Sequence, residues 1–194
     1  SAGGAITTGE GNTVIGFQAL DATTEQDYNT AIGYEVLTAM SGSAGGAYNT
    51  AIGYRAGLSM TTAINNTIVG AEAGDAITTG GYSTYIGKKA GSALTTGAGN
   101  TIIGYEAGET GNFDNCVAVG GGALGRNSGS YNVAIGREAL TNATTVNANT
   151  AVGYLALQDN TAANNTAVGA SASLQNTTGA SNVAVGANAL DANT

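Results

Sequence analysis

One short segment recurs along the whole chain, and this repeat limits the fold more than any other feature. The sequence NTAIGY occurs at residues 29–34 and 49–54, and NTIIGY, NTAVGY and NVAVGA follow at residues 100–105, 149–154 and 182–187. The glycine of the segment recurs eleven times at a mean period of 17 residues, which predicts a stack of similar units. These motif glycines are Gly16, Gly33, Gly53, Gly70, Gly87, Gly104, Gly120, Gly136, Gly153, Gly169 and Gly186.

Positions at equal distance from the motif glycine carry the same kind of residue. The residue immediately before it is always Ile or Val, and we name this set the Ile/Val column. The residue two before it is Ala, Ile or Val, with Tyr85 as the exception, and forms the Ala/Ile column. The third is Thr or Val, and the fourth is Asn except for Ser83 and Cys116. Short β-branched segments that end in glycine favour strands over helices.

The repeat therefore predicts an all-β fold. The segment before each glycine is expected to be one strand, and TTG segments such as residues 78–80 predict a second strand that ends in a turn. We predict a parallel β-solenoid (β-roll) of about eleven coils of 16–17 residues, which makes residues 1–194 a single repeat domain. One interval of 20 residues contains SGSAGGA, residues 41–47, which we expect to bulge from its coil.

Stacked columns predict the interior of the solenoid. We expect the Ile/Val column to fill the coils, against the Ala that follows most motif glycines by three residues. Asn side chains stacked at the coil spacing are expected to hydrogen-bond along the axis. The predicted core ladder is Ile15, Ile32, Ile52, Val69, Ile86, Ile103, Val119, Ile135, Val152, Val168 and Val185. The predicted Asn ladder is Asn12, Asn29, Asn49, Asn66, Asn100, Asn132, Asn149, Asn165 and Asn182.

The predicted strand is apolar on both faces, although a strand with one wet face would alternate apolar and polar residues. The Ala/Ile column then needs a second cover, unless its small alanines tolerate water. The simplest cover is another copy of the same chain. We therefore predict a homotrimer whose contact face includes Val14, Ile68 and Ile102, with Tyr85 pointing away from it or widening it.

Composition argues against several functions. The net charge is -8 with only five Lys and Arg residues, so nucleic acid is not an expected partner. No apolar run approaches the ~20 residues of a membrane span, so we expect no membrane insertion by this segment. Because the chain has no histidine, we expect no enzyme activity, and we predict no cofactor and no metal site. We interpret its one cysteine, Cys116, as a substitute for Asn in the Asn column.

The predicted surface offers candidate binding residues. Tyr34, Tyr54, Tyr105 and Tyr154 follow motif glycines and could stack on sugar rings, or they could cap the coil edge with the hydroxyl in water. Thr pairs such as Thr78–Thr79 could form an ice-binding face. Glutamates two residues after the motif glycine could bind cations, although a solvated edge explains them as well.

Two forms of the motif resemble a known group of fibrous proteins. NVAIG at residues 132–136 and NVAVG at residues 182–186 resemble the head repeats of YadA-type trimeric autotransporter adhesins. The NTAIGYxAL form is similar to repeats of bacteriophage tail fibres. In the adhesins these repeats form a left-handed parallel β-roll wound as a homotrimer, with coils shorter than those predicted here.

The resemblance implies a structural and adhesive fibre segment of a bacterial surface adhesin or a phage tail fibre. Such a rod would lie outside the cell, on a cell or virion surface, and attach to a glycan or protein receptor. The chain begins with SAGG and ends with LDANT, residues 190–194, so we expect it to be a segment of a longer fibre. The alternative is a ligand-binding β-solenoid, with a glycan or ice face, that acts as a monomer.

Overall fold

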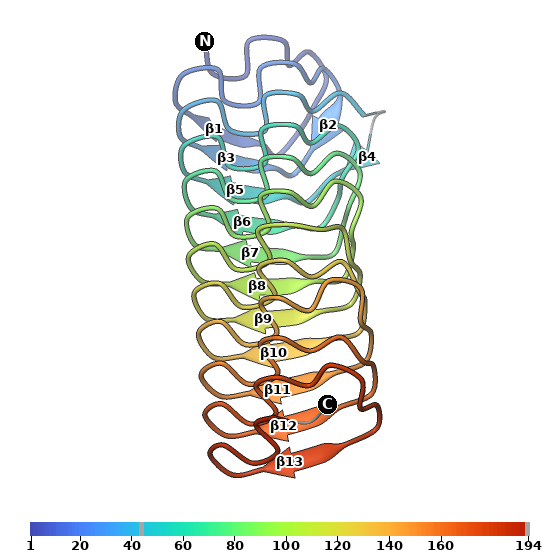
Figure 1. The fold of residues 1–194 in the computed structure, drawn as a ribbon. Coiled ribbons are helices and arrows are strands. Elements are labelled where there is room, and N and C mark those ends of the chain that lie inside the picture. Colours follow the sequence, from blue (N-terminus) through green and yellow to red (C-terminus); the bar gives the residue numbers. More distant parts are fainter. Residues whose placement is uncertain (43–44, 193–194) are drawn as a thin grey trace.

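The computed structural model describes residues 1–42 and 45–192 and shows a parallel β-solenoid of about ten turns (Figure 1). The described residues contain no helix, and the predicted all-β parallel solenoid is confirmed. Eleven strands of three residues form one sheet in chain order. They are β1 (Thr13–Ile15), β3 (Thr30–Ile32), β5 (Thr50–Ile52), β6 (Thr67–Val69), β7 (Thr84–Ile86), β8 (Thr101–Ile103), β9 (Val117–Val119), β10 (Val133–Ile135), β11 (Thr150–Val152), β12 (Thr166–Val168) and β13 (Val183–Val185).

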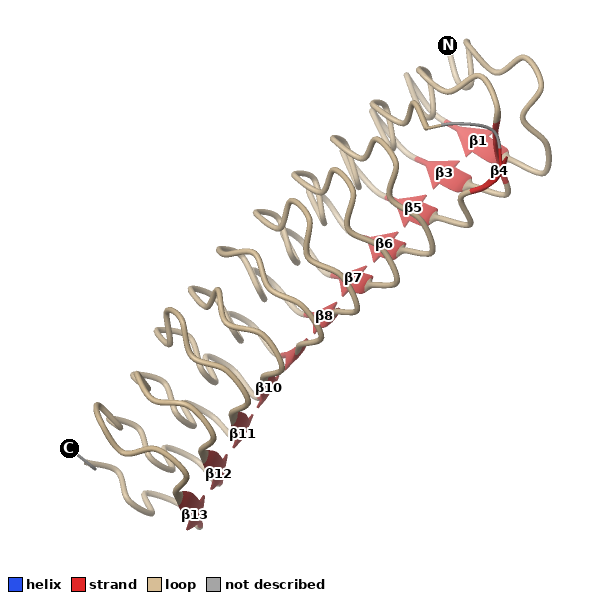
Figure 2. Cartoon of the chain, turned by 90° about the vertical axis from the view of Figure 1, so that its right-hand side faces the viewer, coloured by secondary structure: helices blue, strands red, loops and turns tan. Residues whose placement is uncertain are grey.

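The strands pair in parallel and in register, so each sequence column becomes a line of stacked residues. In the pairing of β7 with β8, Thr84 lies opposite Thr101, and Tyr85 lies opposite Ile102. The strands form a single row along one flank of the rod, and loops make up the rest of each coil (Figure 2).

The second strand that TTG segments predict is not formed in the part of the chain that the structure describes. A second sheet has only two strands, β2 (Gln26–Asp27) and β4 (Gly45–Gly46). The TTG segment at residues 78–80 is a bend, although its backbone still bonds between coils: the Thr78 N–H donates to the Thr95 carbonyl over 2.8 Å. Residues 43–44 of the expected bulge and residues 193–194 of the closing segment lie outside the described residues.

The two faces of the strand are reversed relative to the prediction. The Ala/Ile column lines the interior, where Ile68 and Ile102 are fully buried. The Ile/Val column points outward, and Ile15 and Val185 at its ends are 58% and 71% exposed. Successive residues of a strand point to opposite faces of the sheet. If one column is assigned to the wrong face, the neighbouring column is therefore also assigned to the wrong face.

Two sets of predicted residues are corrected by this reversal. Val14, Ile68 and Ile102 do not form a contact face for another chain, because they pack inside their own coils. The predicted core ladder lies on the outer face of the sheet, half-buried or exposed, at Ile15, Ile32, Ile52, Val69, Ile86, Ile103, Val119, Ile135, Val152, Val168 and Val185.

Matched side-chain volumes across the coil explain why the Ala/Ile column is the one inside. Four residues after each motif glycine stands Leu, Gly or Ser, which we name the Leu/Gly column. Tyr85 is paired with Gly91, where a Cβ would lie 2.4 Å from the Tyr85 Cδ1 atom. Where the strand has Ala134, the same place is filled by the buried Leu140. In these coils a large residue on one wall thus faces a small one on the other, as close packing of the core requires.

The motif glycine permits the turn that follows each strand. Its φ ranges from 122° at Gly16 to 144° at Gly53, a region that residues with a side chain rarely adopt. The glycines also stack directly: a Cβ at Gly104 would lie 2.6 Å from the carbonyl oxygen of Gly120 in the next coil. Glycine is therefore required at this position for both backbone conformation and stacking.

Candidate functional surface

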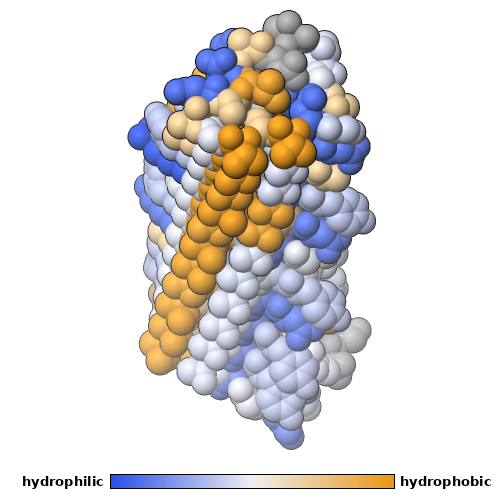
Figure 3. All heavy atoms as spheres, turned by 90° about the horizontal axis from the view of Figure 1, so that it is seen from below, coloured by the Kyte–Doolittle hydropathy of each residue, from blue (hydrophilic) through white to orange (hydrophobic). Residues whose placement is uncertain are grey.

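The outer face of the long sheet is an exposed apolar stripe. We define it as the Ile/Val column, which is flanked by a second column, three before each motif glycine, of eight Thr and three Val residues. Ile52, Ile86 and Ile135 are 37–40% exposed. Neither column contains a charged residue, and hydrophobic atoms gather in a continuous ridge on the surface (Figure 3). The stripe crosses every strand of the sheet from β1 to β13.

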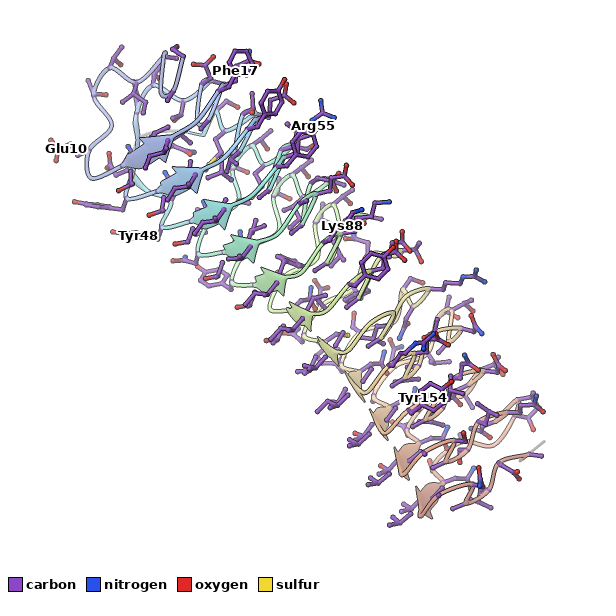
Figure 4. The ribbon with its side chains drawn as sticks, turned by 90° about the vertical axis from the view of Figure 1, so that its left-hand side faces the viewer. Glu10, Phe17, Tyr48, Arg55, Lys88 and Tyr154 are labelled. Atoms are coloured by element: carbon purple, nitrogen blue, oxygen red, sulfur yellow. The ribbon has the colours of Figure 1, made fainter. Side chains whose placement is uncertain are left out.

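Aromatic side chains border the stripe on both sides. Phe17 follows a motif glycine, whereas Tyr48 stands five residues before one, and the two lie on opposite sides of the row of strands (Figure 4). Both are more than half exposed. The second aromatic set was not expected from the sequence, although its regular spacing before the motif could have identified it. Its members are Tyr28, Tyr48, Tyr82 and Tyr131.

Two of the predicted glycan-face residues belong to a stacked aromatic ladder. The Tyr34 ring lies 5.2 Å from Phe17 and 5.5 Å from Tyr54, measured between ring centroids, with interplanar angles of 18° and 16°. The Arg55 guanidinium lies 5.1 Å from the Tyr54 centroid and forms a 2.7 Å ion pair with Glu35. The other two predicted residues, Tyr105 and Tyr154, are exposed and have no aromatic neighbour in their column.

The Asn column forms a buried chain of hydrogen bonds along the axis. The Asn49 Oδ1 atom accepts the Asn66 backbone N–H over 3.0 Å and its side-chain Nδ2 over 3.2 Å. The Asn49 Nδ2 atom in turn donates to the Ala63 carbonyl over 2.9 Å, in the loop that precedes Asn66. Backbone bonds of this kind were not expected from side-chain stacking alone. Members of the column therefore join neighbouring coils, and several also hold a loop carbonyl 13–14 residues further along the chain.

Cys116 occupies one place in this chain of hydrogen bonds. Its backbone N–H donates to the Asn100 Oδ1 atom over 2.9 Å, and its sulfur accepts the Asn132 N–H over 3.3 Å. Burial raises the pKa of the Cys116 thiol to about 11. The thiol is therefore neutral near pH 7, which is unfavourable for a nucleophile or a metal ligand.

The threonine pairs lie on a different flank from the stripe. In several coils the hydroxyl of the first threonine donates to a carbonyl of the next coil, over 3.2 Å from Thr7 to Thr24 and 3.1 Å from Thr61 to Thr78. These hydroxyls are therefore partly engaged in holding the coils together.

The described residues show no group of three or more Cys, Asp or Glu side chains arranged to hold a metal ion. Within the same residues there is no helix that could cross a membrane.

The fold and its surface place the chain in the class of parallel β-solenoid repeat proteins. No family model matches it, and no curated protein or solved structure matches it either.

Proposed function

We propose that this chain is a rigid segment of an extracellular fibre, assembled as a parallel homotrimer through its apolar stripe and used for attachment to a cell surface. The observation that carries this proposal is the stripe itself. It runs the length of an uncharged sheet face and leaves large residues such as Ile86 and Ile135 exposed. Continuous exposed apolar patches of this kind mark interaction surfaces.

A second copy of the chain is the partner that fits the stripe best. The stripe repeats at every coil, so a partner must present apolar groups with the same repeat over the same length. Another copy that lies parallel provides this match at every coil. The aromatic borders support the same assignment, because tyrosine is enriched at protein interfaces.

The resemblance to adhesin head repeats supports three chains rather than two. Three stripes arranged around one axis would all be buried at once, with the aromatic borders at the rim. A rod built in this way has no helical hinge among the described residues and few charged residues along its axis, which suits a stiff spacer between an anchor and a receptor. Attachment to a cell-surface glycan or protein follows from the same resemblance.

Mass measurement by light scattering tests the assembly. We expect the purified chain to have three times its monomer mass of 18.8 kDa. The double variant Ile86→Asp and Ile135→Asp places a charge in the stripe of each of two coils and should give monomers that keep β-rich circular dichroism. The matched control is Thr79→Asp, an exposed residue on another flank, which should leave the mass unchanged.

A monomer at micromolar concentration with intact circular dichroism would refute the homotrimer, and a dimer would refute the number of chains. Binding of the labelled segment to bacterial and animal cells tests attachment. If a correctly assembled trimer binds no cell surface, the segment acts only as a structural spacer. That result would contradict the adhesive part of the proposal.

A further inference from the structure

Two tyrosines of the chain are presented in the same way by the same local sequence. Gly33-Tyr34-Glu35 and Gly104-Tyr105-Glu106 share the order Gly-Tyr-Glu, with glycine φ values of 139° and 140° and a φ of 52° at both glutamates. In each pair the neighbouring glutamate raises the tyrosine pKa. The two tyrosines therefore share a local backbone geometry, and their neighbours along the axis differ.

The ring faces of Tyr34 are both covered. Phe17 and Tyr54 stack on its two sides at centroid distances of 5.2 and 5.5 Å. A ligand ring that stacks on an aromatic face cannot reach Tyr34 without separating this ladder. Both faces of Tyr34 are thus occupied and leave no face for a sugar, whereas Tyr54 has Tyr34 on one side and the Arg55 guanidinium 5.1 Å from its ring centroid.

Tyr105 has an open side. The next coil places Gly121 beside it, as shown by the backbone bonds from Gly122 N–H to the Tyr105 carbonyl, 3.0 Å, and from Glu138 N–H to the Gly121 carbonyl, 2.9 Å. A Cβ built at Gly121 would meet only the Tyr105 carbonyl oxygen within 4 Å, at 3.7 Å. No side chain from the Gly121 position therefore covers the Tyr105 ring.

The coil beyond Gly121 carries Arg137 and Glu138 in the same two columns as Tyr105 and Glu106, and we call the space over Gly121, between Tyr105 and Arg137, the notch. Arg137 and Glu138 are joined by a 2.8 Å ion pair, and the Glu138 Oε2 atom accepts a 3.3 Å hydrogen bond from Gln158. Two coil spacings separate Tyr105 from Arg137 along the axis, about 9.6 Å at the spacing of neighbouring strands. Since Gly121 lies between them, the space is suited to one ring inserted edgewise from solvent.

We propose that this notch binds a neutral pyranose with equatorial hydroxyls, such as a β-linked glucose or N-acetylglucosamine unit. The weakly positive C–H groups on the face of such a sugar would stack on the negative face of the Tyr105 ring. Glu106 and Glu138 accept hydrogen bonds from its hydroxyls, and Arg137 donates to them. Two carboxylates and one guanidinium disfavour an anionic ligand, as does the chain's net charge of -8.

The inference rests on the proposed attachment function for its biological role, and it names the receptor chemistry. Saturation-transfer NMR and titration calorimetry with cellotetraose as the probe test it on the purified chain. We expect the wild type and Tyr34→Ala to bind equally. Tyr105→Ala should weaken binding at least about tenfold, which is roughly 1.4 kcal/mol.

Gly121→Tyr provides the sharpest test, because it adds no backbone strain and restores the covered arrangement of Tyr34. Its φ lies outside the left-handed region, and tyrosine already occupies the same column at Tyr54 and Tyr154. We expect this variant to lose binding as Tyr105→Ala does while keeping its circular dichroism. Unchanged binding by Gly121→Tyr would overturn the notch, and so would an equal loss in Tyr34→Ala.

Measuring the mass of the same samples separates the test of the sugar site from the test of the homotrimer. A trimer that does not bind cellotetraose at millimolar concentration refutes the sugar site alone. A monomer that binds it in a Tyr105-dependent way refutes the homotrimer and supports the site. Tyr105-dependent binding of a planar aromatic probe instead of the sugar would overturn the assignment of ligand class.

Discussion

Tyr85 on strand β7 lies against Gly91 on the opposite wall of the same coil, so closely that a Cβ at Gly91 would be 2.4 Å from the Tyr85 ring. Tyr85 is fully buried, in a column that elsewhere holds Ala, Val or Ile. The coil thus accommodates its largest inward residue because the facing residue has no side chain.

This relationship predicts that the two positions are energetically coupled. Tyr85→Ala should cost about 3–5 kcal/mol by leaving a cavity. Gly91→Leu alone should also destabilise, because leucine would collide with the ring. The double variant reproduces the Ala134–Leu140 pairing and should recover at least about 1 kcal/mol of the summed loss, measured by denaturant unfolding. Purely additive losses would contradict the volume matching.

The orientation of the strand is tested by two adjacent residues. Ile102→Asp places a charge in the buried interior and should cost several kcal/mol or prevent folding. Ile103→Asp lies on the outer face and should keep the β-rich circular dichroism of the coil while weakening chain assembly. Thermal melts of the two variants side by side give the answer. If Ile103→Asp melts as low as Ile102→Asp, the orientation of the strand is wrong.

The motif glycines should tolerate no side chain. Gly104→Ala requires a φ of 140° and brings a Cβ within 2.6 Å of the Gly120 carbonyl oxygen, so we expect a loss of more than about 3 kcal/mol in unfolding free energy. Gly121→Ala is the matched control, because its Cβ would make only an ordinary 3.7 Å contact with the Tyr105 carbonyl oxygen, and should change stability by less than about 0.5 kcal/mol. Equal effects of the two changes would show that stacking does not require the motif glycine.

The Asn column should contribute strongly to stability. Asn49→Ala removes the acceptor for the Asn66 N–H and the donor to the Ala63 carbonyl, leaving buried polar groups unpaired. The expected cost is about 1–3 kcal/mol in chemical denaturation. Gln175→Ala, at an exposed position, serves as the control and should be near neutral. If Asn49→Ala destabilises the protein no more than Gln175→Ala does, the Asn ladder does not stabilise the fold.

Cys116 predicts a specific dependence of stability on pH. An unfolded thiol has a pKa of about 8.5, whereas burial raises that of Cys116 to about 11. The folded state therefore holds its proton over a range in which the unfolded state loses it. The stabilising contribution is complete below the unfolded pKa and is lost as pH rises through the folded pKa.

The wild type and Cys116→Ser contain the same tyrosines. The difference between their unfolding free energies therefore reports the contribution of the Cys116 thiol. Between pH 8 and 11 the unfolding free energy of the wild type should fall more steeply than that of the variant. Parallel curves would show that the thiol titrates alike in the folded and unfolded states. The native thiol should also react slowly with alkylating reagents near pH 7.

The sequence alone determined the overall architecture. A 17-residue period forces each unit to contact only its neighbours, so identical columns must stack. β-branched residues before a glycine that needs positive φ located the eleven strands of the long sheet, whereas β2 and β4 of the second sheet carry no such pattern. The 17-residue period also assigned Asn49 and the other members of the Asn ladder to one stacked column.

Only the tertiary structure decided which side of each strand faces inward. Ile102 and Ile103 are both apolar, so alternation could not distinguish the buried residue from the exposed one. The choice depends on the volume of the facing wall, where Gly108 leaves room for Ile102 and Leu140 fills the space beside Ala134. The open face of Tyr105 is likewise set by Gly121, a neighbour along the axis and 16 residues away in the chain. Such packing relationships join residues across a coil or between coils, so they cannot be read from a single column of the sequence.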